Sequence, residues 1–180
     1  MEYRDGGLRL AGLAAAIAEM RALLALARAA GMPVVHIAHH GRPGAALFGP
    51  AGPQVAIIPA VAPADGEAVV VKSLPNAFAG TALSRLIGES GRRELVVAGF
   101  ATHMRVGATV RTALDLGYRT TVVAAACATR DLPDPLGGIV PAETVHRAAL
   151  AALADRFAVV VADSARLTAV AAGTEVPARL

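Results

Sequence analysis

The chain has 180 residues, of which 55% are hydrophobic, 17% charged and 3% aromatic, and its formal net charge at pH 7 is +3. This length fits one domain with a substantial core, and the hydrophobic fraction excludes an intrinsically disordered chain. The scarcity of aromatic residues and the scattered arginines argue against a nucleic-acid surface, and the single cysteine excludes an intrachain disulfide.

The sequence carries no signal for export or for membrane insertion. It has no uncharged apolar run of about 18 residues, which a membrane-spanning helix would need. Glu2 and Asp5 lie where a secretory signal peptide would carry basic residues. We therefore expect a cytoplasmic protein that binds neither membrane nor nucleic acid.

The first part of the chain predicts one helix and one strand. Residues 1–10 are polar and rich in glycine, so they predict no strand. Residues 11–30 are rich in Ala and Leu and are followed by Gly31, which is typical of a helix ended by glycine. Residues 33–39 (PVVHIAH) form a short apolar run, which predicts a buried strand.

The end of this strand is rich in histidine and leads into a long proline-rich segment. His36, His39 and His40 resemble a metal cluster, but no Asp-x-His arrangement accompanies them. We therefore expect no metal, with His39 and His40 at the rim of a pocket. Residues 41–66 are too long for a bare connector and carry the apolar run 55–58. Such a segment predicts a lid or a subunit contact.

The next strand and helix bring in a candidate site residue. Residues 67–72 (EAVVVK) predict a strand that ends at Lys72. Active sites of open α/β sheets form at the carboxyl ends of strands, so Lys72 lies where a site is expected. Thr81 can cap a following helix, residues 82–87.

The middle of the chain predicts a strand–turn–helix–strand unit. Residues 95–98 form an apolar run, typical of a strand buried on both faces. Residues 100–104 predict a tight turn, residues 105–116 a helix, and residues 118–124 the next strand. In such units ligands bind at the carboxyl ends of the strands.

The last third of the chain predicts two helices around one strand. Cys127 lies in an apolar run, where we expect a buried and inert thiol. Residues 141–156 predict a helix with His146 on its polar side. Residues 157–161 predict the last strand and residues 164–172 a short helix, after which we expect the tail to fray.

The alternation of strands and helices predicts an α/β fold. We expect three layers, with a mostly parallel sheet and helices on both of its faces. The whole chain, residues 1–180, is expected to form a single domain.

Three ordered segments carry a family resemblance: residues 72–81 (KSLPNAFAGT), residues 99–106 (GFATHMRV) with Thr109, and residues 128–133 (ATRDLP). This set resembles the isochorismatase-like cysteine hydrolases, whose central turn is G-x-x-T-x-x-C-V-x-x-T. The resemblance covers nearly the whole chain. It implies the fold of that family and a catalytic triad of aspartate, lysine and cysteine.

Two of the three triad positions depart from the family pattern. Lys72 matches the triad lysine, but the position of the nucleophilic cysteine holds Arg105. The aspartate ends a first, central strand, which by this resemblance would lie upstream of Met1. Either the start was assigned too late or the chain is truncated. Ala125 also stands where the family usually has an aspartate.

The resemblance also implies a binding pocket. Its candidate substrate-binding residues are Phe78, Phe100, Ala101, Thr102 and His39. We expect a small-molecule ligand such as a carboxylate, no cofactor, and a homo-oligomer as among the family's members.

Three functions remain open, because a guanidinium stays protonated and cannot act as a nucleophile. The first is a catalytically impaired pseudoenzyme, in which Lys72, Arg105 and a helix N-terminus bind a carboxylate or phosphate. The alternative is an active hydrolase of a small amide, imide or vinyl-ether substrate. Thr102 or Ser73 would then be the nucleophile, although neither has an evident base. A third function is a structural partner of an active paralogue.

Overall fold

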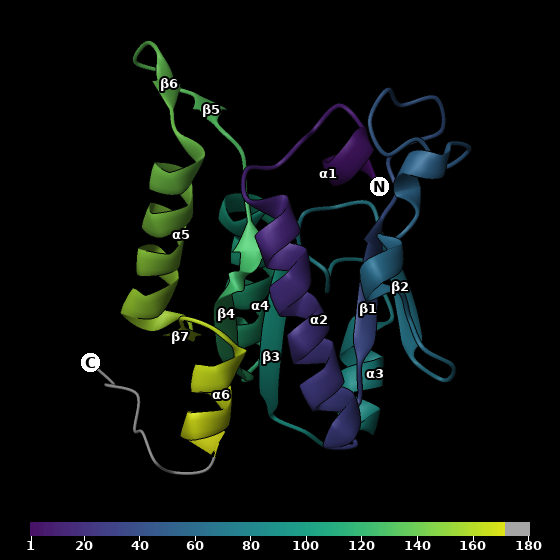
Figure 1. Ribbon diagram of the computed structural model, residues 1–180. Coiled ribbons are helices and arrows are strands. Elements are labelled where there is room, and N and C mark those ends of the chain that lie inside the picture. Colours follow the sequence, from purple (N-terminus) through teal and green to yellow (C-terminus); the bar gives the residue numbers. More distant parts are fainter. Residues whose placement is uncertain (172–180) are drawn as a thin grey trace.

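The computed structural model describes residues 1–171 as alternating helices and parallel strands (Figure 1). The strands are β1 Val35–His39, β2 Ala68–Lys72, β3 Glu94–Phe100, β4 Arg119–Ala128, β5 Leu132–Pro133, β6 Ile139–Val140 and β7 Val159–Val161. The helices are α1 Glu2–Asp5, α2 Leu13–Ala29, α3 Leu83–Glu89, α4 Gly107–Asp115, α5 Ala142–Arg156 and α6 Ser164–Ala171. Short helical turns are η1 Pro53–Val55, η2 Pro59–Val61 and the π-helical turn η3 Thr102–Val106.

Helices cover both faces of the strands, so the predicted α/β fold is confirmed. On one face, Met20 and Leu23 of α2 pack with Leu167 of α6 against Val123 of β4. On the other face, α4 and α5 enclose the opposite side of β4, where Leu153 and Val110 are fully buried. Helix α3 packs beside α4, in a cluster with Val70 of β2.

The parallel strands form two separate sheets. Strands β3, β4 and β7 pair in that order, and β1 pairs with β2, but no hydrogen-bonded ladder joins β1 to β3 within residues 1–171. In Figure 1, α2 lies in front of the space between β1 and β3. The prediction of a missing first strand concerns a segment outside this chain, and it stays a prediction.

The β1–β2 pair is less buried than the sequence predicts. Ile37 of β1 is 36% exposed, and Val69 and Val71 of β2 are about half exposed. The prediction of a buried strand at residues 33–39 is therefore wrong in part. The physical reason is that α2 packs mainly on β4 and η2, and so leaves apolar side chains of β1 and β2 uncovered.

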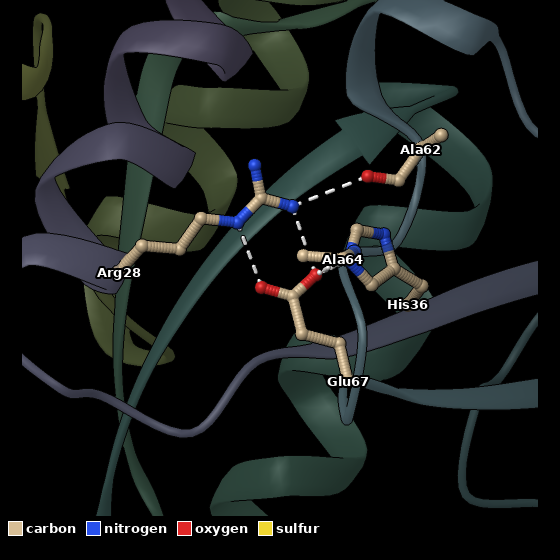
Figure 2. A network of polar contacts seen from close by, with 5 residues as sticks. All are labelled: Arg28, His36, Ala62, Ala64 and Glu67. Atoms are coloured by element: carbon tan, nitrogen blue, oxygen red, sulfur yellow. Dashed lines mark hydrogen bonds and ion pairs between the residues drawn. The ribbon is translucent and has the colours of Figure 1, made fainter.

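A polar network fastens the C-terminal end of α2 to β1 and β2 (Figure 2). The carboxylate of Glu67 accepts two hydrogen bonds from Arg28, each of 2.8 Å, and contacts His36 Nε2 at 2.8 Å. It also accepts the backbone N–H of Ala64. Arg28 donates further to the carbonyl of Ala62. His36 thus contacts a carboxylate, and no group of metal-ligating residues forms in the described part of the chain.

Element boundaries differ from the sequence predictions at three places. The helix expected from residue 105 begins at Gly107 and is preceded by the π-helical turn η3, in which Val106 N–H reaches the carbonyl of Ala101. The strand expected to end at residue 124 continues to Ala128, because a register shift lets Cys127 pair with Gly99. The hairpin β5–β6 was not predicted, and the expected fraying after residue 172 lies outside the described residues.

None of the helices within residues 1–171 is long and apolar enough to cross a membrane. The expected cytoplasmic location stays a prediction.

Candidate functional site

The carboxyl ends of β1 and β2 bring two predicted site residues together. His39 and Lys72 are Cα partners in the parallel register, so their side chains lie on the same face of the pair. Arg105 joins them from η3, the turn that follows β3. Its charge acts on the pKa of both His39 and Lys72. The structure therefore gathers His39, Lys72 and Arg105 into one cluster.

Lys72 is a buried cation held by backbone carbonyls. Its side chain is 5% exposed, and Nζ donates to the carbonyl oxygens of Leu74 and Pro75 at 2.7 and 2.8 Å. Burial first, and then the charge of Arg105, lowers the pKa of Lys72 to about 8. At neutral pH the ammonium group is mostly protonated, in a place where its charge is poorly solvated.

Arg105 is enclosed by aromatic rings. Its guanidinium lies 4.8 Å from the ring centroid of Phe48 and 5.5 Å from that of Tyr3, which is the geometry of cation–π contacts. One terminal nitrogen donates to the Tyr3 hydroxyl and lies 3.8 Å from Met104 Sδ. The Nε–H of Arg105 is buried and has no hydrogen-bond partner among the described residues. An unsatisfied donor on a buried cation is costly, and an added acceptor would satisfy it.

His39 completes the cluster as a neutral ring. It packs edge-on against Phe48, with 4.8 Å between ring centroids, and its buried Nδ1 has no hydrogen-bond partner within residues 1–171. Burial, followed by the charges of Arg105 and Lys72, lowers the pKa of His39 to about 4. At neutral pH this imidazole is therefore uncharged and can donate or accept a hydrogen bond.

No carboxylate compensates these cations within residues 1–171. Neither Lys72 nor Arg105 forms an ion pair there, and the charged groups that act on the pKa of Lys72 and His39 include no acid. The cluster is therefore a concentration of positive charge in a partly dry place, which favours a bound anion.

A cover from the N-terminus and from the proline-rich segment closes over Arg105. Tyr3 of α1 contacts Phe48 edge-on, at 5.3 Å between ring centroids, and also contacts Phe100 at 5.9 Å. Glu2, only 2% exposed, joins the two parts by accepting the backbone N–H groups of Phe48 and Gly7. Phe48 comes from residues 41–66, and the role of that segment as a lid or a subunit contact stays a prediction.

The remaining predicted binding residues are buried to different depths. Phe100 is half-buried beside Tyr3, and Ala101 is 3% exposed at the start of η3. Phe78 is a core residue whose ring stacks on Tyr118, with centroids 6.1 Å apart. The role of each as a substrate-binding residue stays a prediction.

Thr102 faces a different partner. Its hydroxyl is completely buried, 3.1 Å from the carbonyl of Ala128 and 2.9 Å from Nδ1 of His146. The expectation that Thr102 has no base nearby is therefore wrong. The expectation that His146 lies on the polar side of its helix is also wrong, because the side chain is half-buried against η3.

Tyr3 and Phe48 were missed as contacts of Arg105. The chain has only two Tyr and four Phe residues. An aromatic residue outside the predicted strands could therefore have been proposed as a contact of the site. Cys127 is buried as predicted, and burial raises its thiol pKa to about 12. The only thiol of the chain is thus protonated at neutral pH.

Comparison with known proteins identifies the family. The Isochorismatase domain model matches residues 2–165, and the chain belongs to this family. It is 34% identical over 160 residues to the secreted isochorismatase effector Isc1 of Verticillium dahliae, covering 89% of this chain and 82% of that protein. It is 42% identical over 142 residues to a streptothricin hydrolase of Streptomyces noursei, covering 78% of this chain and 51% of that protein.

A solved structure agrees with the family assignment. The crystal structure of an isochorismatase from Pseudomonas putida KT2440 superposes with a TM-score of 0.83 at 42% sequence identity. The match covers 89% of this chain and 81% of that chain. The fold is therefore that of the isochorismatase-like hydrolases.

Proposed function

We propose that this isochorismatase-family protein binds a small carboxylate at Lys72 and Arg105, without the cysteine chemistry of the family. The observation that carries the proposal is the unsatisfied Nε–H of Arg105, buried beside a second uncompensated cation. A carboxylate supplies two acceptor oxygens and a negative charge, so it would satisfy this donor and stabilise both cations.

The neighbouring residues support a ligand with an apolar or flat portion. His39 offers one further hydrogen bond through its unpartnered Nδ1. Tyr3 and Phe48 present ring surfaces over Arg105, and part of this cover must move aside when a ligand enters. The absence of a usable thiol supports binding without covalent catalysis, because Cys127 is buried with a raised pKa.

Thermal unfolding in the presence of small carboxylates tests this function. At about a hundredfold excess over the dissociation constant, acetate, benzoate or maleate should raise the Tm by about 5–10 °C. Sodium chloride at the same ionic strength should not. Arg105→Gln should abolish the shift, whereas Arg85→Gln, an exposed arginine on α3, should leave it unchanged. A wild-type protein with no carboxylate-specific shift would contradict the proposal.

Hydrolysis through Thr102 is the second candidate, favoured by the 2.9 Å contact of its hydroxyl with His146. A hydroxyl beside an imidazole is the arrangement of an activated nucleophile. It ranks second because the hydroxyl has no exposed surface in this structure. Turnover of an amide or ester panel that is lost in both Thr102→Val and His146→Gln would favour this candidate over pure binding. The role of a structural partner for an active paralogue stays a prediction.

A further inference from the structure

A groove lies between the hairpin β5–β6, η3, the start of α4 and one side of α5, near the end of α5 from which the hairpin projects (Figure 1). Its volume is about 460 Å³, which is enough for a small organic ligand. None of His39, Lys72 and Arg105 lines it, so it is a different place from the cation cluster. Its apolar walls consist of aliphatic side chains, among them Leu132, Pro133, Val140, Val145, Ala148 and Ala149.

Arg111 of α4 brings a positive charge to this groove in a fixed position. Its Nη1 donates to the carbonyl of Gly107 at 3.2 Å, and its guanidinium lies 4.9 Å from the ring centroid of Phe157. A Cβ atom at position 107 would lie only 2.9 Å from this nitrogen, so the glycine leaves room for the guanidinium. The side chain is therefore already positioned in the free protein, and a ligand that binds to it loses little affinity to side-chain ordering.

No acid compensates Arg111 within residues 1–171. It forms no ion pair there, and the lining of the groove contains neither Asp nor Glu. Nearby, Asp131 and Asp134 each accept a backbone N–H group, and Glu143 lies 3.8 Å from Arg147. A single guanidinium balances one negative charge, and its forked N–H groups match the two oxygens of a carboxylate.

Two uncharged polar side chains, His103 and Thr144, also line the groove. Nδ1 of His103 lies 2.6 Å from the hydroxyl of Thr129. Burial first, and then the charges of Arg130 and Arg105, lowers the pKa of His103, so its ring is neutral at pH 7. Apart from this imidazole the lining holds no aromatic ring. The walls therefore suit an aliphatic chain better than a flat ring, which would stack on aromatic side chains.

We propose that this groove is a second ligand site, which binds an aliphatic carboxylate of the fatty-acid type. The carboxylate lies on Arg111, and the chain runs along the apolar walls, where its CH₂ groups leave water. A carboxylate without a chain, or a chain without a charge, makes only one of these two contacts. The site is independent of the carboxylate binding proposed at Lys72 and Arg105, because the two share no lining residue.

Titration with octanoate, followed by the NMR chemical shifts of backbone amides, tests this site. The titration uses both the wild type and Arg105→Gln, because the cluster of Lys72 and Arg105 is itself proposed to bind carboxylates. In both proteins octanoate should shift the amides of Val145 and Ala149 in a saturable manner. At these amides, acetate and octanol should each bind at least about tenfold more weakly, because acetate lacks the chain and octanol lacks the charge.

Two variants separate the charge of the groove from its apolar walls. Arg111→Gln should weaken octanoate binding by about tenfold or more, because it removes charge-assisted hydrogen bonds. Ala148→Phe should weaken it at least as much by filling the groove. The matched control is Arg119→Gln, which removes an exposed arginine of β4 paired with Glu94 and should leave the affinity unchanged. Circular dichroism and the Tm of each variant establish that it folds.

The outcomes for the two proposed sites can be told apart. A wild type without carboxylate binding that depends on Arg105 contradicts the function proposed at Lys72 and Arg105, and it leaves the groove untouched. The absence of saturable shifts at Val145 and Ala149 would overturn the ligand site in the groove, as would octanol that binds as tightly as octanoate. An octanoate affinity unchanged in either Arg111→Gln or Ala148→Phe, or weakened equally in Arg119→Gln, would overturn it as well.

Discussion

At the scale of single residues, the candidate site depends on how burial lowers the pKa of two basic groups, His39 and Lys72, that lie with Arg105. Lys72 and Arg105 are protonated at neutral pH, and His39 is neutral because burial and the neighbouring cations lower its pKa to about 4. Burial raises the free energy of the charged Lys72 and Arg105 side chains, and a bound anion would lower it. Arg105 spreads its charge over the rings of Phe48 and Tyr3, which stabilises it without any carboxylate.

The first residue-scale prediction concerns pH. The Lys72 pKa of about 8 means that its charge is present below pH 8 and is lost as the pH rises through 8. Carboxylate affinity should therefore fall by up to about tenfold between pH 7 and pH 9, as followed by calorimetric titration. Lys72→Met should bind more weakly at pH 7 and show no such fall. A wild-type affinity that stays constant across this range would exclude Lys72 from the site.

At the scale of elements, the most informative contact lies far from the site, between α2, β1 and β2. The carboxylate of Glu67 contacts the side chains of Arg28 and His36 and accepts the N–H of Ala64 (Figure 2). Arg28, His36 and Glu67 come from separate parts of the chain. Their bonds orient the end of α2 over β1, where no sheet ladder continues to β3 within residues 1–171. The network therefore holds α2 against β1 by side-chain hydrogen bonds, as strand pairing holds neighbouring strands together elsewhere in the molecule.

Removing this carboxylate should destabilise the fold. Glu67→Gln loses the charge-assisted bonds to Arg28 and should lower the Tm by about 4–8 °C at pH 7. Hydrogen bonds from Arg28 and Ala64 hold the pKa of Glu67 well below its usual range, so its contribution is present above pH 4.5 and is lost as the pH falls below that value. The Tm difference between wild type and Glu67→Gln should thus shrink in acid.

The matched control is Glu89→Gln, which removes an exposed carboxylate paired with Arg85 on α3. Its Tm should change little at any pH, because exposed pairs contribute little. A constant difference between wild type and Glu67→Gln from pH 7 down to pH 3 would show that the ionised carboxylate is not the stabilising group.

At the scale of the whole molecule, the main feature is that the parallel strands form two separate sheets. Val122 of β4 pairs with β3 on one side and β7 on the other, whereas in the described part of the chain β1 and β3 each have one edge without a ladder. The apolar core nevertheless connects both parts, since Val35 of β1 and Leu95 of β3 pack against the same cluster beneath α3. Side-chain packing here joins strands that backbone hydrogen bonds do not.

Hydrogen exchange measures this directly. In a parallel strand, alternate amides point to opposite neighbours. Alternate amides of β1 and β3 should therefore exchange at least about a hundredfold faster than those of the central part of β4. Uniform protection along β1 and β3, equal to that of Val122 and Val123, would mean that both edges are paired in solution.

Much of the architecture followed from local sequence patterns. Helical periodicity, terminal glycines and short apolar runs predicted α2, α5 and the strands β2, β3 and β7, because these signals act between residues a few positions apart. The ordered motifs around Lys72 and residues 99–106 identified the family and pointed to the edge of the sheet where the candidate site lies.

Only the tertiary structure decided what surrounds the candidate site. The contacts of Arg105 with Tyr3 and Phe48 join residues that are distant in sequence, and no local pattern encodes such a meeting. No local pattern predicts the contact of Thr102 with His146 either. The same holds for the exposure of Val69 and Val71. The sequence by itself determined which elements form and which residue types stand at strand ends. The packing of those elements decided which of these residues are buried. Burial in turn determined their protonation states and their contact partners.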